Sequence, residues 1–535
     1  MDIRCGSCGA SVGAPAKFCS ECGTRLSHTK QSAEYKQVTV LFVDVVGSMD
    51  IAKGVGAERL REIMSELIDC ASAVVQRCGG TLDKFTGDGI MAVFGAPVAL
   101  EDHAMRACLA ALGIQGEMQP VAAAVLDRDR VTLRLRVGLN SGQVIAGEIG
   151  SGATGYTAVG EHVGMAQRME SAAPPGGVML SASTARLVGG LAELDEPELV
   201  QIKGADDPVP ARRLLGIGRQ DRTTRTEADL VGRQWEMSAI EGLLDRAISG
   251  RGAVVGVVGP PGIGKSRVTR ELAALAARRG VDVFTTYCES HTSQVPFQVI
   301  TRLLRAATGL EGLDPAHARA LIDAQAFADA DPEDVALFKD LLCIGDPDAT
   351  LPRIDPDARR RRLTALVNAA TVANQTPAVY VIEDAHWIDE SSESMLADFL
   401  TVVPQTRLLT VITYRPEYRG SLTQVPGAQT IALAPLTNSE TEALVAGLLG
   451  PDSSVARLGG TVSERASGTP FFAEEIVREL AERGVLQGEP GAYVSTTAAA
   501  EVSVPATLQA TIASRIDRLD PKAKRTLSAA AVVGS

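Results

Sequence analysis

The sequence has few aromatic residues and no excess of positive charge. Phe, Trp and Tyr make up 4% of the 535 residues, and the formal net charge is −13 at pH 7. Such an acidic chain is poorly suited to broad binding of nucleic acids or anionic membranes, because their phosphate groups attract cations. No apolar run approaches the length of a membrane span, and the N-terminus lacks the hydrophobic core of a signal peptide. We therefore expect a cytoplasmic protein with neither membrane nor nucleic acid as a partner.

Cysteine is scarce beyond the first 22 residues, and there it lies in apolar contexts typical of reduced core thiols. The N-terminal cysteines form two C-x2-C pairs, each followed by Gly: Cys5, Cys8, Cys19 and Cys22. Four thiolates at this spacing suit tetrahedral Zn²⁺, and so short a segment needs a bound metal or another cross-link in order to fold. Residues 1–26 therefore resemble a zinc ribbon with a structural or docking role towards an unknown protein. A disulfide pair or an unfolded tail is the alternative.

The length allows about three domains. A polar stretch, residues 27–35, is predicted to be a linker. A second one, residues 216–228, is rich in Thr and Arg and has no hydrophobic period. Between and after these linkers, strand and helix patterns alternate, which predicts a multidomain α/β protein. Arg outnumbers Lys and Ala is abundant, which hints at a GC-rich bacterial genome.

Two apolar, β-branched runs each present an aspartate. VTVLFVDV delivers Asp44 at a strand end, and KFTGDGIMAVFG carries Asp88 between two glycines in a predicted hairpin. Two rigidly held carboxylates suit a two-metal phosphoryl-transfer site, in which one ion activates a hydroxyl and the other steadies phosphate charge. Taken alone, either aspartate is more simply interpreted as a loop residue that caps a strand or helix.

Together the two segments resemble the class III nucleotide cyclases, whose pattern is a strand ending in Asp, a helix, and then K-x-x-G-D-(G/S). The resemblance runs from about residue 35 and implies a ferredoxin-like palm over residues 36–215. In that family the two aspartates, here Asp44 and Asp88, hold Mg²⁺ or Mn²⁺. Each site is built across a homodimer, in which one subunit supplies the metals and the other reads the base.

A second predicted hairpin, followed by GEHVGMAQRME, matches the remaining positions of the family. The resemblance implies that Lys84 and Thr157 recognise adenine, with Lys donating to a ring acceptor and the Thr hydroxyl accepting from the exocyclic amine. These residues favour ATP over GTP, and Thr at this position is typical of the soluble, bicarbonate-responsive branch. Arg168 matches the arginine that stabilises the negative phosphorane during attack of the ribose 3′ hydroxyl.

The sequence departs from the family pattern within GEHVGMAQR. Gly164 stands where the family has an Asn that orients the ribose, and loss of one such donor costs on the order of 100-fold in rate elsewhere. This predicts reduced turnover with retained nucleotide binding. A G-x-G-x-x-G pattern at residues 150–155 resembles a dinucleotide fingerprint, but a strand-like segment follows it, so we interpret it as a hairpin tip.

A phosphate-binding loop follows the second linker. The motif G-x4-G-K-S comes after an apolar strand and before an amphipathic helix, and its expected nucleotide contacts are Gly259, Gly262, Gly264, Lys265 and Ser266. Backbone N–H groups would wrap the phosphates, Lys265 would reach the β and γ oxygens, and Ser266 would ligate Mg²⁺. The strand VYVIED ends in Glu383 and Asp384. One should meet Mg²⁺ through water and the other should polarise the attacking water, and the sequence leaves open which does which.

Five segments resemble the signal-transducing ATPases of the STAND class: LVGR, the P-loop, EDAHWID, TYRPE and the tripeptide Gly468-Thr469-Pro470. Such ATPases are found fused to cyclases and transcription regulators. The resemblance implies an ATP-binding domain over residues 229–500, with Arg415 as the γ-phosphate sensor and Pro470 against adenine. Alone, such residues are ordinary capping positions. Residues 501–535 look like the start of the helical or winged-helix module that follows in relatives, so we expect a truncated or shortened chain.

These features predict a modular adenylate cyclase: zinc ribbon, cyclase domain and regulatory ATPase. Its cofactors would be structural Zn²⁺, Mg²⁺ or Mn²⁺ at the cyclase site, and ATP with Mg²⁺ at the P-loop. The alternative is a cyclase-like protein weakened by Gly164 that acts as an ATP-dependent signalling module. A transcription regulator is a third possibility, which the acidic balance and the lack of a recognisable DNA-reading helix disfavour.

Overall fold

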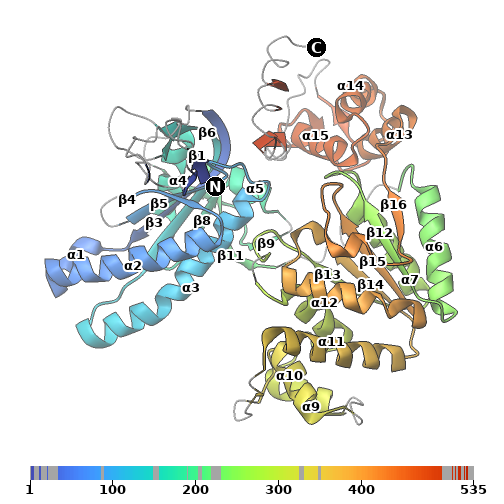
Figure 1. Ribbon diagram of the computed structural model, residues 1–535. Coiled ribbons are helices and arrows are strands. Elements are labelled where there is room, and N and C mark those ends of the chain that lie inside the picture. The colour runs from blue at the N-terminus through green and yellow to red at the C-terminus, as the bar shows by residue number, and fades with distance from the viewer. Residues whose placement is uncertain are drawn as a thin grey trace. The chain divides into compact units, whose positions relative to one another are not determined.

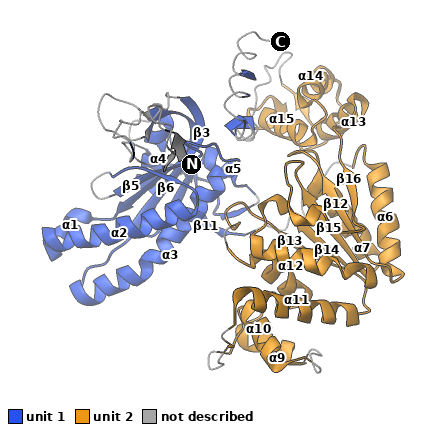
Figure 2. Ribbon diagram, viewed as in Figure 1, with its two compact units in different colours: residues 1–225, 504–535 blue, residues 226–503 orange. Residues whose placement is uncertain are grey.

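The computed structural model describes residues 2–4, 11–13, 21, 34–85, 89–148, 156–189, 191–202, 208–218, 230–293, 295–324, 330–346, 351–352 and 354–496. Near the C-terminus it describes residues 509, 512–513, 516–517, 519, 523 and 526–527. The chain divides into two compact units, each with its own core (Figure 2). Unit 1 comprises residues 1–225 and 504–535, and unit 2 comprises residues 226–503.

A twisted sheet forms the centre of unit 1 (Figure 1). Its strand order is β10 (Glu198–Val200), β11 (Val209–Ile217), β8 (Val178–Ser181), β6 (Leu135–Glu148), β3 (Glu34–Val45), β5 (Gly89–Phe94) and β4 (Thr81–Phe85). In addition, β7 (Tyr156–Val159) pairs with β6, and β9 (Ala192–Leu194) pairs with β11. The central strands β3 and β5 are almost wholly buried, which explains their continuous apolar runs. A separate hairpin joins β1 (Asp2–Arg4) and β2 (Ser11–Gly13).

Helices cover both faces of this sheet. The unit contains α1 (Ser48–Val55), α2 (Ala57–Arg77), α3 (His103–Asp129), α4 (Glu161–Ala172) and α5 (Ala182–Leu187). The main core joins α2 and α3 to residues on one face of β3, such as Leu41 and Val43, whereas α4 packs on the opposite face with Val38 and Val40. The predicted amphipathic helix is present as α2, with its apolar stripe buried and its end just before the Gly79–Gly80 pair.

One helix differs from the expectation that no segment could span a membrane. By length and composition alone, α3 is long and apolar enough to do so. Its apolar positions, among them Ala107, Ala111 and Ile114, belong to the core of unit 1. One side of the helix therefore packs in the core of unit 1, while 28% of its most apolar 18-residue window is buried.

Unit 2 is a three-layer α/β/α structure around a parallel sheet. The strand order is β13 (Asp282–Tyr287), β14 (Ala378–Glu383), β15 (Leu408–Tyr414), β12 (Ala253–Val258) and β16 (Gln429–Ala432). Its first face is covered by α6 (Gln234–Ile248) and α7 (Lys265–Arg278). The second is covered by α8 (Gln298–Ala307), α11 (Pro356–Ala373) and α12 (Glu390–Leu400). The carboxyl ends of β12, β14 and β15 meet at one edge, where open parallel sheets bind their ligands.

Smaller elements complete unit 2. These are α9 (Pro315–Ala324), α10 (Pro332–Leu341), α13 (Asn438–Leu449), α14 (Ala456–Ala466), α15 (Pro470–Glu482), and the strands β17 (Leu486–Gln487) and β18 (Val494–Ser495). Short 3-10 helices span Ala385–Trp387, Val403–Gln405, Ser421–Thr423 and Ser453–Val455. Of these, α15 matters most for function, because its first turn lies against the loop that follows β12.

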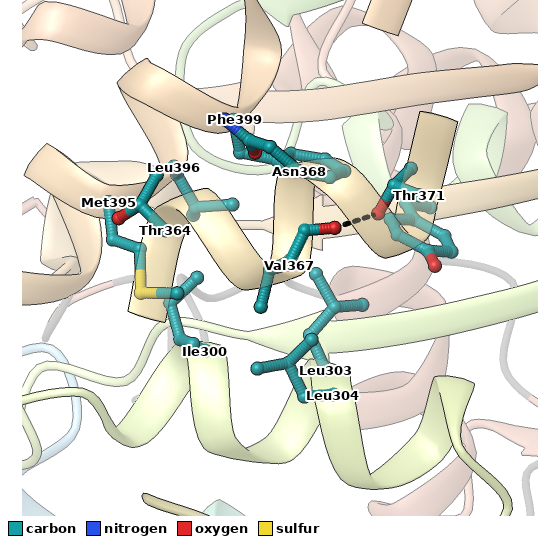
Figure 3. A pocket seen from close by; sticks show the side chains of 11 residues that line it. Ile300, Leu303, Leu304, Thr364, Val367, Asn368, Thr371, Met395, Leu396 and Phe399 are labelled. Carbon is teal, nitrogen blue, oxygen red and sulfur yellow. Dashed lines mark hydrogen bonds between the residues drawn. The ribbon is translucent and has the colours of Figure 1, made fainter. Parts of the chain in front are cut away.

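A small apolar hollow lies between α8, α11, α12 and β14 (Figure 3). Its lining includes Leu303, Val367, Tyr380 and Phe399, and burial raises the pKa of Tyr380 to about 12. The rings of Tyr380 and Phe399 stack with their centroids 6.1 Å apart. None of the sequence-predicted nucleotide contacts lines the hollow, so it belongs to the packing of the helices behind the sheet rather than to the nucleotide edge.

Candidate functional site

Asp44 lies at the end of β3, directly opposite Gly89 of β5. The second expected metal ligand, Asp88, precedes Gly89 in the sequence but lies outside the described residues. The Asp44 side chain is 24% exposed and forms an ion pair with Arg136 of β6, with Nη2 3.5 Å from Oδ2. A half-buried carboxylate at a strand end is a hard oxygen donor of the kind that Mg²⁺ and Mn²⁺ prefer, so the residue present here fits a divalent cation.

The two residues expected to read the base lie on strands that do not pair with each other, since β4 pairs with β5 and β7 pairs with β6. Lys84 is exposed in β4, and Thr157 is half-buried in β7. The strands are joined through the adjacent residues, because the backbone N–H of Ala158 donates to Oδ2 of Asp83 at 2.9 Å. Within the described part of the chain, neither the Lys84 ammonium nor the Thr157 hydroxyl has a hydrogen-bond or ionic partner. Both polar groups are therefore available to a ligand.

Helix α4 carries Arg168 and Gly164. The Arg168 side chain is half-buried and makes no hydrogen bond or ion pair with any residue that the structure describes. A Cβ added at Gly164 would meet no heavy atom of the described residues within 4 Å, so they leave the space of the missing side chain open. The ring of neighbouring His162 packs on Gly142 and does not fill this space. The substitution of the family Asn is therefore not compensated by His162.

The sequence did not single out two charged residues that contact this site. Arg136 lies opposite Asp44 in the β3–β6 ladder, and its Nε is 3.3 Å from Oε1 of Glu170 on α4. Glu170 is almost completely buried. From the sequence alone, Glu170 is one polar residue among others on a polar helix segment. Its burial could be recognised only together with its cation, Arg136, which lies on a strand far away in the sequence.

The phosphate-binding loop of unit 2 joins β12 to α7. Gly262 and Gly264 have φ values of 76° and 103°, which favour glycine. Lys265 begins α7 and donates to the carbonyl oxygens of Gly259 at 3.0 Å and Pro260 at 3.2 Å. Burial lowers the pKa of the Lys265 ammonium, and the negative charge of Asp384 opposes that shift. The ammonium is thus held over the loop, where phosphate oxygens would replace the carbonyl groups.

The acidic pair at the end of β14 has two distinct environments. Glu383 is buried and accepts hydrogen bonds from Ser266 Oγ at 2.5 Å and Thr269 Oγ1 at 3.0 Å. Asp384 adopts a left-handed φ of 57°, and its N–H donates to Thr413 Oγ1 at 2.9 Å. The carboxylate of Glu383 therefore lies beside the hydroxyl expected to ligate Mg²⁺, whereas Asp384 begins the following turn. Thr269 is a contact that the sequence pattern did not indicate.

Two further predicted residues lie at the same edge of the sheet. Arg415 directly follows β15, the strand that lies between β12 of the P-loop and β14 of the acidic pair. The guanidinium of Arg415 is 5.9 Å from the ring centre of Trp387. Pro470 is the first residue of α15, and the next residue, Phe471, donates its N–H to the carbonyl of Gly262 at 3.2 Å. The structure thus brings together the P-loop, the acidic pair, Arg415 and Pro470.

The arginine of the VGR segment forms hydrogen bonds to the backbone of the P-loop. Arg233 is buried, and its Nη2 donates to the carbonyl oxygens of Ile263 at 3.0 Å and Ala434 at 2.8 Å. It therefore ties the loop to the segment that follows β16. The sequence pattern included this arginine in a motif but assigned it no role.

The predicted zinc ligands Cys5, Cys8, Cys19 and Cys22 lie outside the described residues. Among the residues that are described, no cluster of three or more His, Cys, Asp or Glu side chains is arranged to hold a metal ion. The zinc ribbon therefore stays a prediction.

Comparisons with known proteins agree with the two sites. Residues 30–211 match the family model described as the adenylate and guanylate cyclase catalytic domain, and residues 229–412 match the AAA ATPase domain. Residues 437–492 match a third model, described as a domain of unknown function. The chain thus contains a class III cyclase domain followed by an AAA-type P-loop ATPase domain.

Relatives with similar sequences cover the chain to different extents. An uncharacterized protein of Rhizobium meliloti is 28% identical over 519 residues, which are 94% of this chain and 49% of the relative. Adenylate cyclase 1 of the same organism is 32% identical over 206 residues, which are 38% of this chain and 31% of the relative. The chain thus spans about half the length of the first relative and about a third of the second.

Solved cyclase structures are similar to about a third of the chain. The guanylyl cyclase Cya2 is 30% identical and covers 36% of this chain and 97% of its own, with a TM-score of 0.34. The adenylyl cyclase CyaB from P. aeruginosa is 26% identical and covers 35% of this chain and 98% of its own, with a TM-score of 0.33.

Proposed function

We propose that this protein is an adenylate cyclase, which converts ATP to 3′,5′-cyclic AMP and pyrophosphate, and that its ATPase domain regulates the cyclase. The proposal is supported by the cyclase match over residues 30–211 and by the similarity to an adenylate cyclase of Rhizobium meliloti. The observation that carries it is the hydrogen bond between Asp83 and Ala158, because it links the strands of Lys84 and Thr157, two polar groups without a partner among the described residues.

The choice of ATP over GTP rests on the chemistry of those two side chains. The Lys84 ammonium can only donate, so it suits an acceptor nitrogen of the purine ring. The Thr157 hydroxyl can accept from the exocyclic amine of adenine, whereas guanine presents a carbonyl oxygen at the equivalent place. This hydroxyl can also donate, so the preference for adenine is one of degree.

In the proposed reaction, Asp44 and Asp88 hold divalent cations, which when bound activate the ribose 3′ hydroxyl and neutralise phosphate charge. Arg168 places a fixed cation where negative charge develops on the α-phosphate, and such preorganised charge is usually the largest catalytic contribution. Complete sites would form only in a homodimer with two equivalent sites. At each site, one copy would supply the metal ligands and the other copy the residues that read the base.

The remaining parts of the proposal concern regulation. ATP bound by Lys265, Ser266 and Glu383 would act as the signal, as the resemblance to STAND ATPases implies. The hydrogen bonds from Ser266 and Thr269 to Glu383 support Glu383 as the Mg²⁺-side carboxylate and leave Asp384 to polarise water. A zinc ribbon at residues 1–26 would dock a further protein.

The test is to incubate the purified chain with ATP or with GTP, in the presence of Mn²⁺ or Mg²⁺, and to quantify both cyclic nucleotides. Asp44→Ala provides the blank. We expect cyclic AMP in excess of cyclic GMP, and no product from the variant. Cyclic GMP in excess would contradict the base assignment. No product above the blank, with ATP still bound at the P-loop, would instead support the ATP-dependent signalling module.

A further inference from the structure

Three positions on one face of β6 each contact α4. Arg136 forms an ion pair with Glu170, Gly138 faces the backbone of Ala166 and Glu170, and Asn140 donates through Nδ2 to the carbonyl of His162 at 2.9 Å. A Cβ at Gly138 would lie 1.9 Å from the backbone nitrogen of Glu170, so the helix rests directly on the strand.

The three contacts have matching spacing along both elements. Four residues of β6 advance about 13 Å, and eight residues of α4 advance about 12 Å. The helix therefore lies along the strand in the opposite direction, with its C-terminal end beside Arg136. Arg136 also donates through Nη1 to the carbonyl of Ser171 at 3.4 Å, where a cation is favourable at a helix C-terminus.

Arg136 is shared between two carboxylates that differ in exposure. Its Nε lies 3.3 Å from Glu170, whose side chain is 8% exposed, and its Nη2 lies 3.5 Å from Asp44, whose side chain is 24% exposed. A nearly buried carboxylate is costly without its cation, whereas a more exposed one can exchange partners with less cost. Arg136 and Glu170 form an ion pair without a hydrogen bond between Nε and Oε1, whereas Nη2 donates to Asp44. Because Glu170 is the more buried carboxylate, its ion pair is the costlier of the two to separate, and the Arg136–Asp44 contact is the more readily exchanged.

We propose that Arg136 is a positioning residue that couples divalent-metal binding at Asp44 to the placement of Arg168 of the same chain through Glu170 and α4, so that in the proposed homodimer the two equivalent sites are coupled. The inference rests on the proposed cyclase function. When a divalent cation binds Asp44, the guanidinium gives up that carboxylate and keeps Glu170 and Ser171, which lie two and three residues after Arg168 on the same helix. Coupling of this kind is reciprocal, so the position of α4 also sets the affinity for the metal.

The proposal predicts opposite effects on metal binding and turnover. Arg136→Gln removes a cation that competes for Asp44, so Mn²⁺ should bind more tightly, by about tenfold for a charge at this distance. The same change leaves Glu170 without its arginine and loosens α4, so kcat should fall. Glu170→Gln leaves Asp44 as the carboxylate that pairs with Arg136, so Mn²⁺ should bind several-fold more weakly while kcat also falls. A merely structural role would weaken both properties in both variants.

Mn²⁺ binding is measured on the full chain by electron paramagnetic resonance without nucleotide, and the signal lost in Asp44→Ala defines the site. Arg136→Lys keeps the charge and should return the metal affinity close to that of the wild type. Arg134→Gln, an exposed arginine two residues earlier, is the matched control and should change neither readout. Retained nucleotide binding by unit 2 and an unchanged circular dichroism spectrum establish that each variant is folded.

Tighter Mn²⁺ binding in Arg136→Gln together with weaker binding in Glu170→Gln would support the coupling. Equal affinities in both variants and the wild type, or weaker binding in both, would overturn it. Absence of cyclic nucleotide from the wild-type chain would contradict the proposed function alone, because the Mn²⁺ measurement would still decide the role of Arg136. If Arg136→Gln does not fold, the Arg136→Lys and Glu170→Gln pair decides: equal metal affinity in these two variants overturns the coupling.

Discussion

At the scale of single residues, Gly164 is a position where this chain departs from the cyclase pattern. The open space around it allows a direct test, because Gly164→Asn adds a hydrogen-bond donor without a clash. We expect cyclic AMP formation to rise by at least about tenfold, since one donor at a developing charge is worth 100-fold or more in other enzymes. The measurement is kcat with ATP and Mn²⁺.

The matched control for this change is Gly164→Ala, which adds helix propensity but no donor. A rate for the Asn variant that does not exceed that of the Ala variant would show that the space at position 164 is not used for the ribose. The comparison separates the chemistry of the amide from any stiffening of α4.

His103 offers a second residue-scale prediction, on pH dependence. It is fully buried at the start of α3, where its Nδ1 lies 2.7 Å from Thr39 Oγ1, and burial lowers its pKa from 6.5 to about 4. The unfolded chain therefore binds more protons between these values, so stability rises with pH there and is fully present above about pH 6.5. The shift corresponds to about 3 kcal/mol, which is lost as pH falls to 4.

We expect His103→Gln to reduce this dependence. The measurement is the protection of β3 amides from hydrogen exchange at pH 5 and pH 7.5, corrected for intrinsic exchange rates. His317→Gln, at an exposed histidine of α9, is the control and should behave as the wild type. An equal loss of protection at pH 5 in the wild type and His103→Gln would rule out His103 as the source.

At the scale of elements, the docking of α4 on β6 depends on a residue without a side chain. Gly138→Ala would place a methyl group 1.9 Å from the backbone nitrogen of Glu170 and 2.5 Å from the carbonyl oxygen of Ala166. Because backbone atoms cannot rotate away, α4 must shift. We expect unit 1 to lose about 1–3 kcal/mol of stability and the cyclase to lose at least about tenfold in rate.

A matched glycine lies in α3. Gly116 is exposed within a helix, and a Cβ there would meet no heavy atom within 4 Å, so Gly116→Ala should stabilise the unit by up to about 1 kcal/mol. Chemical unfolding of both variants, followed by fluorescence and by cyclase rate, checks the contrast. Full activity in Gly138→Ala would contradict the importance of this contact.

Elements were easier to predict than the contacts between them. The apolar stripe of α2 and the runs that became β3, β5 and β12 are local patterns, and the structure contains them. Glycine spacing likewise indicated the P-loop, because its positive φ values are a local requirement. The pairing of Asp44 and Glu170 with Arg136 was not predictable, because it depends on strand register and on the helix that packs across the strands.

The acidic pair of unit 2 shows the same limit. Periodicity places Glu383 and Asp384 at a strand end, but it does not say which carboxylate turns toward the P-loop. The outcome depends on the left-handed φ of Asp384 and on a hydroxyl from β15, a strand inserted between β12 and β14. Such inserted neighbours are set by sheet topology, which a single sequence does not encode as a local pattern.

At the scale of the whole molecule, two nucleotide-binding units share one chain, and both are proposed to take ATP. Lys265 is the residue that separates their roles, because it lies in unit 2 and its ammonium would contact only the nucleotide of the P-loop. Lys265→Ala removes a charge-assisted contact and should weaken ATP binding there by about 10- to 100-fold. A fluorescent ATP analogue, displaced by ATP, measures this loss.

If the ATPase domain regulates the cyclase, occupation of the P-loop must change the rate of cyclic AMP formation. We expect the rate of the wild-type chain to show two phases over a full ATP titration, and the rate of Lys265→Ala to show one. At saturating ATP the rates of the two proteins should differ by at least about fivefold, because coupling between sites is typically about 1–3 kcal/mol. Arg278→Ala, an exposed arginine at the end of α7, controls for removal of a cation from the same helix. If the titrations of the wild type and Lys265→Ala superimpose although the variant has lost ATP binding at the P-loop, the two units work independently. A ligand shifts a conformational equilibrium only when its affinity differs between the two states.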